Sequence, residues 1–147
     1  MVASILNGPN INLIGQREPE IYGKIGYEKF VEAILKYADA LKITCELIHS
    51  NSEGTLIDKI QSFEGDFIIL NSGAYTHYSH AIADAVRAVS TPVIEVHLTN
   101  INSRETFRKN SVIAPFCVAQ LSGFGWGGYF MALDFISGRL KRCWKNT

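Results

Sequence analysis

Apolar residues follow two patterns along the chain. Short uninterrupted runs alternate with longer segments in which apolar residues recur every three or four positions, as in Phe30, Ile34, Tyr37 and Leu41. The runs are typical of β-strands, and the spaced segments are typical of amphipathic helices. We therefore predict strands at residues 2–6, 43–48, 66–70, 92–96 and 117–121, and helices at residues 27–41, 55–63, 77–89 and about 127–145.

The pattern within one strand indicates how the elements are layered. Residues 67–70 are apolar without alternation, which favours a strand covered by helices on both faces. Strands that alternate with helices form a parallel sheet between two helical layers. We expect an α/β fold, a flavodoxin-like three-layer sandwich with a five-stranded parallel sheet in the order 2-1-3-4-5, and a single domain over residues 1–147.

Polar side chains gather where three of the predicted strands end. Residues 7–12, 71–77 and 95–100 are rich in amide, imidazole and hydroxyl groups. In this topology ligands bind outside the carboxyl ends of the strands, at the switch point between strands 1 and 3. The sequence therefore predicts a site for a small oxygenated molecule at this edge of the sheet.

Composition excludes several classes of partner. The chain has 147 residues, with 14 basic and 14 acidic side chains, so it lacks the net positive charge that attracts nucleic acid or anionic lipid. Its apolar runs fall short of the roughly 20 residues of a membrane span, and the N-terminus lacks the features of a signal peptide. We expect a cytoplasmic protein without nucleic-acid or membrane partners.

The cysteines and two of the histidines offer little for metal binding. Cys45, Cys117 and Cys143 are an odd number without CxxC spacing, which favours buried thiols over disulfides or zinc ligands. His77 and His80 are three residues apart in a predicted helix, a spacing that places both on one face. No nearby sequence pattern supplies a third metal ligand, so we predict no metal.

Glu95 and His97 are a candidate acid–base pair. They lie two residues apart on a predicted strand, so their side chains share a face. A carboxylate beside an imidazole orients the ring and favours its protonated form, which suits a general acid. A purely structural pair remains the alternative at this point.

Arg104 and Arg108 are candidates for binding anionic or hydroxylated groups. They lie four residues apart, and Asn102 with Glu105 resembles the start of a helix, so a short helix is predicted to point both guanidiniums the same way. They form either a solvated face or a rim that binds a carboxylate or hydroxyls. Their position just beyond strand 4 favours the rim.

Two glycine-containing segments need separate interpretation. Residues 123–128 (GFGWGG) match GxGxxG, but only one helix follows, so we reject a dinucleotide site and predict close backbone packing or a turn beside a neighbouring subunit. Residues 15–24 (GQREPEIYGK) read as a loop broken by glycine and proline. By itself this loop is either a solvated connection or a functional segment.

Several separated stretches together resemble one family, the type II 3-dehydroquinate dehydratases. The matching stretches are NGPNIN (7–12), QREPEIYG (16–23), NSEGTLID (51–58), NSGAYTHYSHAIADA (71–85), EVHLTNINSRETFRKNS (95–111) and GFGWGGYFMAL (123–133). They span nearly the whole chain in order. The resemblance implies a lyase that converts 3-dehydroquinate to 3-dehydroshikimate without metal or organic cofactor, in the shikimate pathway or in quinate catabolism, assembled as a dodecamer (a tetramer of trimers).

The resemblance also gives the loop a function. It implies a mobile lid at about residues 16–25, with Tyr22 as the base and Arg17 beside it. An ordinary tyrosine has a pKa near 10, so forming its anion at pH 7 costs about 4 kcal/mol. A guanidinium about 4 Å away contributes on the order of 4 kcal/mol at an effective dielectric near 20, which offsets most of this cost.

The resemblance implies further roles at the strand ends and on the segments that follow them. It implies that a water held near Asn10 stabilises an enolate and that His97, oriented by Glu95, protonates the departing hydroxyl. For the substrate carboxylate, the resemblance implies binding by Asn71 and by the backbone amides of Leu98 and Thr99. For the ring hydroxyls, it implies His77 and Arg108. It also implies that Asp84 reaches a neighbouring subunit's site and that Arg104 lies close to the lid.

The sequence departs from the family pattern at a few positions and leaves rival functions open. Ser72 replaces a usual proline and is expected to loosen the backbone, Ser52 replaces a histidine, and Thr99 replaces a frequent serine. A flavin module and a phospho-receiver are disfavoured, since the strand ends carry asparagines instead of a Ser/Thr phosphate loop or paired acids. A non-catalytic assembly protein with this fold stays open, and a Schiff-base route is disfavoured because the three polar strand ends hold no lysine.

Overall fold

The structure, a computed structural model, describes residues 1–15 and 26–139. Some predictions concern residues outside these ranges. The expected lid with Tyr22 and Arg17 lies there, and so does Cys143.

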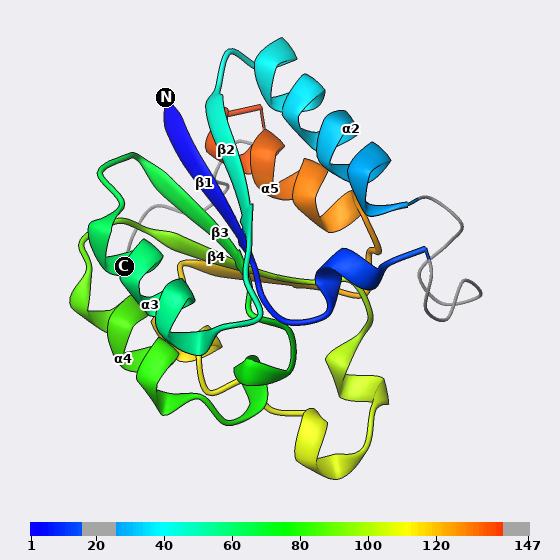
Figure 1. Cartoon of the computed structure of the whole chain (residues 1–147), viewed down its shortest axis with the longest axis vertical. Helices are drawn as coiled ribbons and strands as arrows, with labels where there is room; N and C mark the ends of the chain where they lie inside the picture. Colours follow the sequence, from blue (N-terminus) through cyan, green and yellow to red (C-terminus); the bar gives the residue numbers. More distant parts are fainter. Residues whose placement is uncertain (16–25, 140–147) are drawn as a thin grey trace.

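The strands form one parallel sheet, as predicted. Its order is β2-β1-β3-β4-β5, and every neighbouring pair is parallel (Figure 1). The strand bounds are β1 (Val2–Asn7), β2 (Thr44–His49), β3 (Phe67–Asn71), β4 (Val93–His97) and β5 (Ala119–Ser122). The α/β class and the strand order expected from the sequence are therefore confirmed.

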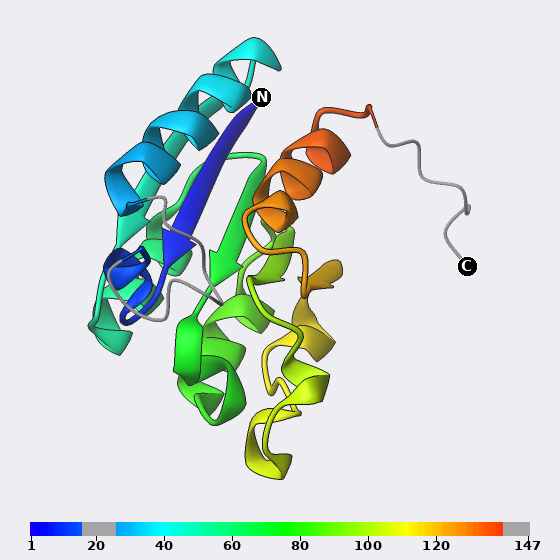
Figure 2. The ribbon, with the colours of Figure 1, turned by 90° about the vertical axis from the view of Figure 1, so that its right-hand side faces the viewer.

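Helices cover both faces of the sheet, and each pair encloses its own apolar core. One core packs α2 (Tyr27–Ala40) and α5 (Gly127–Ile136) against the sheet, and the other packs α3 (Glu53–Ser62) and α4 (His80–Ala88). Figures 1 and 2 show the two pairs on opposite sides of the strands. Ile34 and Ile60, on α2 and α3, are fully buried, as the helical spacing of apolar residues requires.

One helix begins later than predicted. The sequence pattern suggested a helix from residue 77, but His77 ends the separate 3-10 helix η2 (Gly73–His77). The hydroxyl of Ser79 accepts from the Ile82 N–H and caps α4, which begins at His80. The prediction that His77 and His80 share a helical face is therefore wrong.

The last helix ends earlier than predicted. It stops at Ile136 instead of running toward residue 145. Gly138 follows with φ of 80°, a left-handed conformation that commonly ends helices. In the described residues the chain leaves the helix at this glycine.

The GFGWGG segment provides close packing. Gly123 and Gly125 have φ of 93° and 53°, and a Cβ on Gly128 would lie 3.1 Å from Val96 Cγ1. Gly128 therefore lets α5 approach β4 closely, and Gly123 and Gly125 allow the left-handed turn before it. The predicted neighbouring subunit at this segment stays a prediction.

Candidate active site

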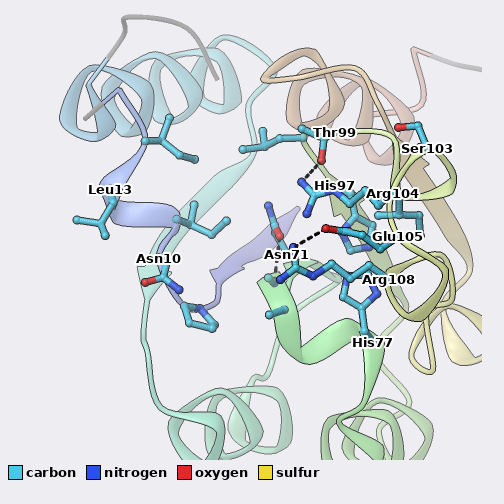
Figure 3. A pocket seen from close by; sticks show the side chains of 17 residues that line it. Asn10, Leu13, Asn71, His77, His97, Thr99, Ser103, Arg104, Glu105 and Arg108 are labelled. Carbon is cyan, nitrogen blue, oxygen red and sulfur yellow. Dashed lines mark hydrogen bonds and ion pairs between the residues drawn. The ribbon is translucent and has the colours of Figure 1, made fainter. Parts of the chain in front are cut away.

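A cavity of about 680 Å³ opens at the carboxyl edge of the sheet. Asn10 and Leu13 lie on one side of it, and His97, Arg104 and Arg108 lie on the other (Figure 3). It occupies the switch point at which the topology predicts a ligand. Eight residues singled out in the sequence line it: Asn10, Asn71, His77, His97, Leu98, Thr99, Arg104 and Arg108.

The ends of β1 and β3 approach closely because Gly8 has no side chain. A Cβ there would lie 2.5 Å from the Ser72 carbonyl oxygen, and the Gly8 N–H donates to the Asn71 carbonyl at 2.7 Å. Asn10 then adopts φ of 67°, a left-handed conformation that asparagine tolerates better than most residues. Its N–H donates to Asn51 Oδ1 at 3.1 Å. These contacts position Asn10 at the cavity.

Glu95 and His97 form a buried pair at the end of β4. The Nε2 atom of His97 lies 3.1 Å from Oε1 of Glu95, and the two side chains are 6% and 0% exposed. The approach departs from a linear hydrogen bond. His97 lines the cavity whereas Glu95 lies behind it. The structure thus confirms that the two side chains share a face.

Three further side chains hold the Glu95 carboxylate. Thr76 donates to Oε1, Ser111 Oγ lies 2.8 and 3.0 Å from Oε1 and Oε2, and Gln120 Nε2 donates to Oε2 at 2.8 Å. Burial alone would raise the pKa of Glu95, but its interaction with His97 and the hydrogen bonds from Thr76 and Ser111 hold the pKa below its usual value. Glu95 is therefore ionised and fixed in orientation.

Sequence reasoning missed these three supporting residues. Gln120 faces Glu95 across the β4–β5 pair, a register that the chain's local pattern does not reveal. Ser111 lies in the loop after η4 (Thr106–Arg108), and its Oγ also accepts from the N–H groups of Ile113 and Ala114. These two N–H groups leave the Ser111 hydroxyl proton to the carboxylate.

The two arginines lie on separate 3-10 turns. Arg104 follows η3 (Ile101–Ser103), and Arg108 ends η4, so the prediction of one short helix bearing both is wrong. Asn100, not Asn102, provides the cap by accepting from the Asn102 N–H at 3.0 Å. Although the two arginines lie on separate three-residue turns, both line the cavity.

Neighbouring groups accompany the arginines at the rim. Arg104 donates to the Thr99 hydroxyl. Arg108 lies 3.9 Å from Glu105, which also lines the cavity and was missed in the sequence. Both members of this second pair are solvent-exposed. The rim is therefore polar and cationic, with one carboxylate among its charges.

His77 is oriented by the backbone. Its Nδ1 lies 2.8 Å from the carbonyl oxygen of Asn110, which can only accept, so Nδ1 carries a proton. His80 is not among the residues that line the cavity. In residues 1–15 and 26–139, His, Cys, Asp and Glu form no cluster of three or more that could hold a metal.

Comparison with known proteins identifies the family. The family model described as "Dehydroquinase class II" matches residues 1–137. The chain belongs to the class II dehydroquinase family. A protein named 3-dehydroquinate dehydratase from Caldicellulosiruptor saccharolyticus is 53% identical over 132 residues, covering 88% of this chain and 91% of the relative. One from Thermotoga petrophila is 40% identical over 141 residues, covering 96% and 98%.

Solved structures of the family share the fold. The type II dehydroquinase of Butyrivibrio crossotus has a TM-score of 0.90 and 47% identity, covering 92% of this chain and 97% of that one. That of Propionibacterium acnes has a TM-score of 0.88 and 33% identity, covering 92% and 95%. The flavodoxin-like sandwich expected from the sequence is thus the architecture of this dehydroquinase chain.

Asp84 lies away from the cavity of its own chain. It is on α4, its side chain is 70% exposed, and it pairs with Arg87 at 3.4 Å. It is not among the lining residues. The role at a neighbouring subunit that the dehydroquinase resemblance implies therefore stays a prediction.

The departures from the dehydroquinase pattern fit the local structure. Ser72 is buried with φ of −73°, close to the angle that a proline ring imposes, and the expected loosening of the backbone before Gly73 stays a prediction. The Ser52 hydroxyl accepts from the Thr55 N–H and caps α3. Each serine lies at the start of a helix, Ser72 before η2 and Ser52 before α3.

The described cysteines are less buried than expected. Cys45 and Cys117 are half-buried free thiols. Burial raises the pKa of Cys45 to about 11 and that of Cys117 to about 12. Both are therefore protonated at neutral pH. Among the described residues, no helix is long and apolar enough to cross a membrane.

Proposed function

We propose that this protein catalyses the reversible dehydration of 3-dehydroquinate to 3-dehydroshikimate. The observation that carries the proposal is the buried Glu95–His97 pair at a cavity lined by amides and guanidiniums, in a chain of the dehydroquinase family. The proteins named 3-dehydroquinate dehydratase among its relatives support this substrate. A cavity of about 680 Å³ is of the size that binds small metabolites.

The first step is proton removal. Tyr22, as its anion, takes a proton from the carbon beside the ketone, and Arg17 stabilises that anion; both residues lie outside the described ranges. The electrons move onto the ketone oxygen and form an enolate. A water held near Asn10 donates to this oxygen, and such a preplaced donor lowers the barrier.

The second step is loss of hydroxide as water. The enolate electrons return, a carbon–carbon double bond forms, and the bond to the hydroxyl breaks on the opposite face. His97 supplies the proton that converts the leaving hydroxyl to water. Glu95 stabilises the imidazolium that must form for this step, and its low pKa keeps it ionised.

The substrate's other groups are held by residues at the ends of β3 and β4 and on the turns that follow them. The carboxylate meets Asn71 and the backbone amides of Leu98 and Thr99. The ring hydroxyls meet His77 and Arg108, and Arg104 lies close to the lid. Each of these six lines the cavity, which supports the assignment.

Assembly and cellular role are further parts of the proposal. We expect a cytoplasmic dodecamer, built as a tetramer of trimers, in which Asp84 helps poise the base of a neighbouring subunit. Residues 1–147 form one catalytic domain with the lid at about residues 16–25. The reaction serves the shikimate pathway of aromatic amino-acid biosynthesis or quinate catabolism.

One assay tests the reaction and its base. Metal-stripped protein is mixed with 3-dehydroquinate while the ultraviolet absorbance of the conjugated enone is followed. We expect a rise that is abolished in Tyr22→Phe and kept in Tyr37→Phe, because the Tyr37 hydroxyl bonds Asp134 between two helices, outside the cavity lining. Unmodified protein that produces no enone would overturn the proposal.

A second assay excludes a covalent route. No lysine occurs among the described residues that line the cavity, and an imine intermediate requires one. Borohydride added with substrate should therefore leave activity unchanged. Inactivation with a mass increase on a lysine would contradict the enolate mechanism.

A further inference from the structure

Tyr129 joins the ends of two neighbouring strands beneath the cavity. It lies on α5, is fully buried, and was not assigned a role from the sequence. Its hydroxyl donates to Asn7 Oδ1 at 2.7 Å and accepts from Asn71 Nδ2 at 2.8 Å. Asn7 and Asn71 end β1 and β3 and are opposite each other in the register.

The donor and acceptor pattern fixes which way the Asn71 amide faces. A tyrosine hydroxyl has one proton, and here it goes to Asn7, so the group that Asn71 presents to Tyr129 must be its Nδ2. The Gly73 N–H donates to Asn71 Oδ1 at 3.2 Å, which requires the same orientation. One of the two Nδ2 hydrogens remains for a ligand in the cavity that Asn71 lines.

The hydroxyl is more than a packing feature. The Tyr129 ring packs edge-on against Phe30 with centroids 5.1 Å apart, a contact that phenylalanine would make equally well. Burying a hydroxyl is unfavourable unless it is hydrogen-bonded, so its presence indicates the bonds it makes. Burial raises the pKa of Tyr129, so the hydroxyl stays protonated and remains a donor to Asn7.

We propose that Tyr129 is a positioning residue that holds the Asn71 amide in the orientation needed to bind the substrate carboxylate. This inference rests on the proposed function. Tyr129 lies beneath Asn71 and acts through it, whereas Asn71 meets the substrate. The amide nitrogen is held from below by Tyr129 and the amide oxygen is held by the backbone of Gly73.

Steady-state kinetics of Tyr129→Phe test the inference. We expect KM to rise about tenfold, the effect of one misdirected hydrogen bond, with kcat changed less than about twofold. The carboxylate contact is made equally in the ground and transition states, so its loss weakens binding without slowing chemistry. A KM within about twofold of the unmodified value would overturn the proposal.

A matched control separates positioning from general destabilisation. Tyr37→Phe also removes a hydroxyl that bridges two elements, since Tyr37 donates to Asp134 at 2.9 Å between α2 and α5. It should lower the unfolding midpoint while leaving KM unchanged. If both variants change KM alike, the effect is structural and Tyr129 does not act on Asn71 specifically.

A double-mutant cycle tests whether the effect passes through Asn71. In an Asn71→Ala background, Tyr129→Phe should change KM by less than about twofold, because the group it positions is gone. A further tenfold rise would show that the two residues act independently, and the inference would fail.

A crystal structure of Tyr129→Phe shows whether Tyr129 orients the Asn71 amide, independently of any activity assay. We expect the Asn71 amide to rotate or to adopt two orientations. An unchanged amide would overturn the inference. If unmodified protein fails to convert 3-dehydroquinate, the proposed function fails, and this structure still reports whether Tyr129 orients Asn71.

Discussion

Glu95 and Glu105 each pair with a residue that lines the cavity, but they lie in opposite environments. Glu95 is fully buried, 3.1 Å from His97, and receives hydrogen bonds from three other side chains. Glu105 is 60% exposed and lies 3.9 Å from Arg108, which is 42% exposed. Each pair joins a carboxylate to a nitrogen-bearing side chain, yet only the first is buried and held in one geometry.

Solvent explains the difference. Removing a carboxylate from water is costly, so a buried one persists only when its oxygens are satisfied, and deleting a partner then costs several kcal/mol. The charges of an exposed pair stay hydrated whether or not the pair forms, so the pair contributes about 0–1 kcal/mol. The buried pair is therefore suited to hold a catalytic ring, whereas the exposed pair can separate when a ligand arrives.

Replacing the reacting end of the buried pair should have the largest effect. His97→Asn removes the general acid, and we expect kcat to fall by about 10²–10⁴-fold. The asparagine retains polarity beside Glu95, so circular dichroism should show a folded protein. Activity within about threefold of the unmodified enzyme would exclude His97 as the acid.

Removing the Glu95 carboxylate tests how much it contributes to the stability of the fold. Glu95→Ala leaves donors from Thr76, Ser111 and Gln120 without their acceptor, so we expect the free energy of unfolding to fall by about 3–5 kcal/mol. Urea denaturation measures this change. A loss below about 1 kcal/mol would show that the buried pair resembles the exposed one.

Removing the Ser111 hydroxyl should change how the free energy of unfolding depends on pH. Ser111→Ala removes a hydrogen bond to an ionised group, expected to cost about 1.5–3 kcal/mol at pH 7. Because the folded pKa of Glu95 is lowered, its stabilising contribution is complete above the unfolded pKa and is lost as pH falls through the folded value.

The variant raises the folded pKa toward the ordinary value near 4.3, so less stability remains to be lost on acidification. Urea unfolding from pH 7 down to about pH 3 should therefore show a shallower acid slope in Ser111→Ala than in the unmodified protein. Parallel curves would mean that Ser111 does not help to keep Glu95 ionised.

Changing the exposed carboxylate should have the smallest effect on folding. Glu105→Gln is expected to alter the free energy of unfolding by less than about 0.5 kcal/mol, and the change should diminish in added salt. The same urea titration measures it. A loss above about 1.5 kcal/mol would remove the distinction between the two pairs.

Much of the fold and part of the site follow from the sequence. Alternating apolar runs and helical spacing predicted the strands and helices, because burial on a strand or a helix imposes its own period. The strand order was expected from the alternation of these elements along the chain. Glu95 and His97 were predicted to face the same way because side chains on a strand repeat every two residues. The clustering of Asn10, Asn71 and His97 follows from the meeting of parallel strand ends at one edge.

Other features required the tertiary structure. Local spacing predicted one helix bearing Arg104 and Arg108, but the chain forms two 3-10 turns. The local pattern likewise predicted that the helix begins at residue 77. In the structure Ser79 caps α4, which begins at His80. Competing local conformations of similar energy are decided by packing, which the spacing of apolar residues does not record.

What the sequence by itself determined is therefore periodic and local: the layers, the strand order, the family motifs and the residues at the strand ends. Only the tertiary structure decided which side chains hold those residues in place. Gln120 reaches Glu95 from the neighbouring strand, and Tyr129 reaches Asn71 from a helix 58 residues later. Such contacts depend on register and on the burial of polar groups, which join residues that no local pattern connects.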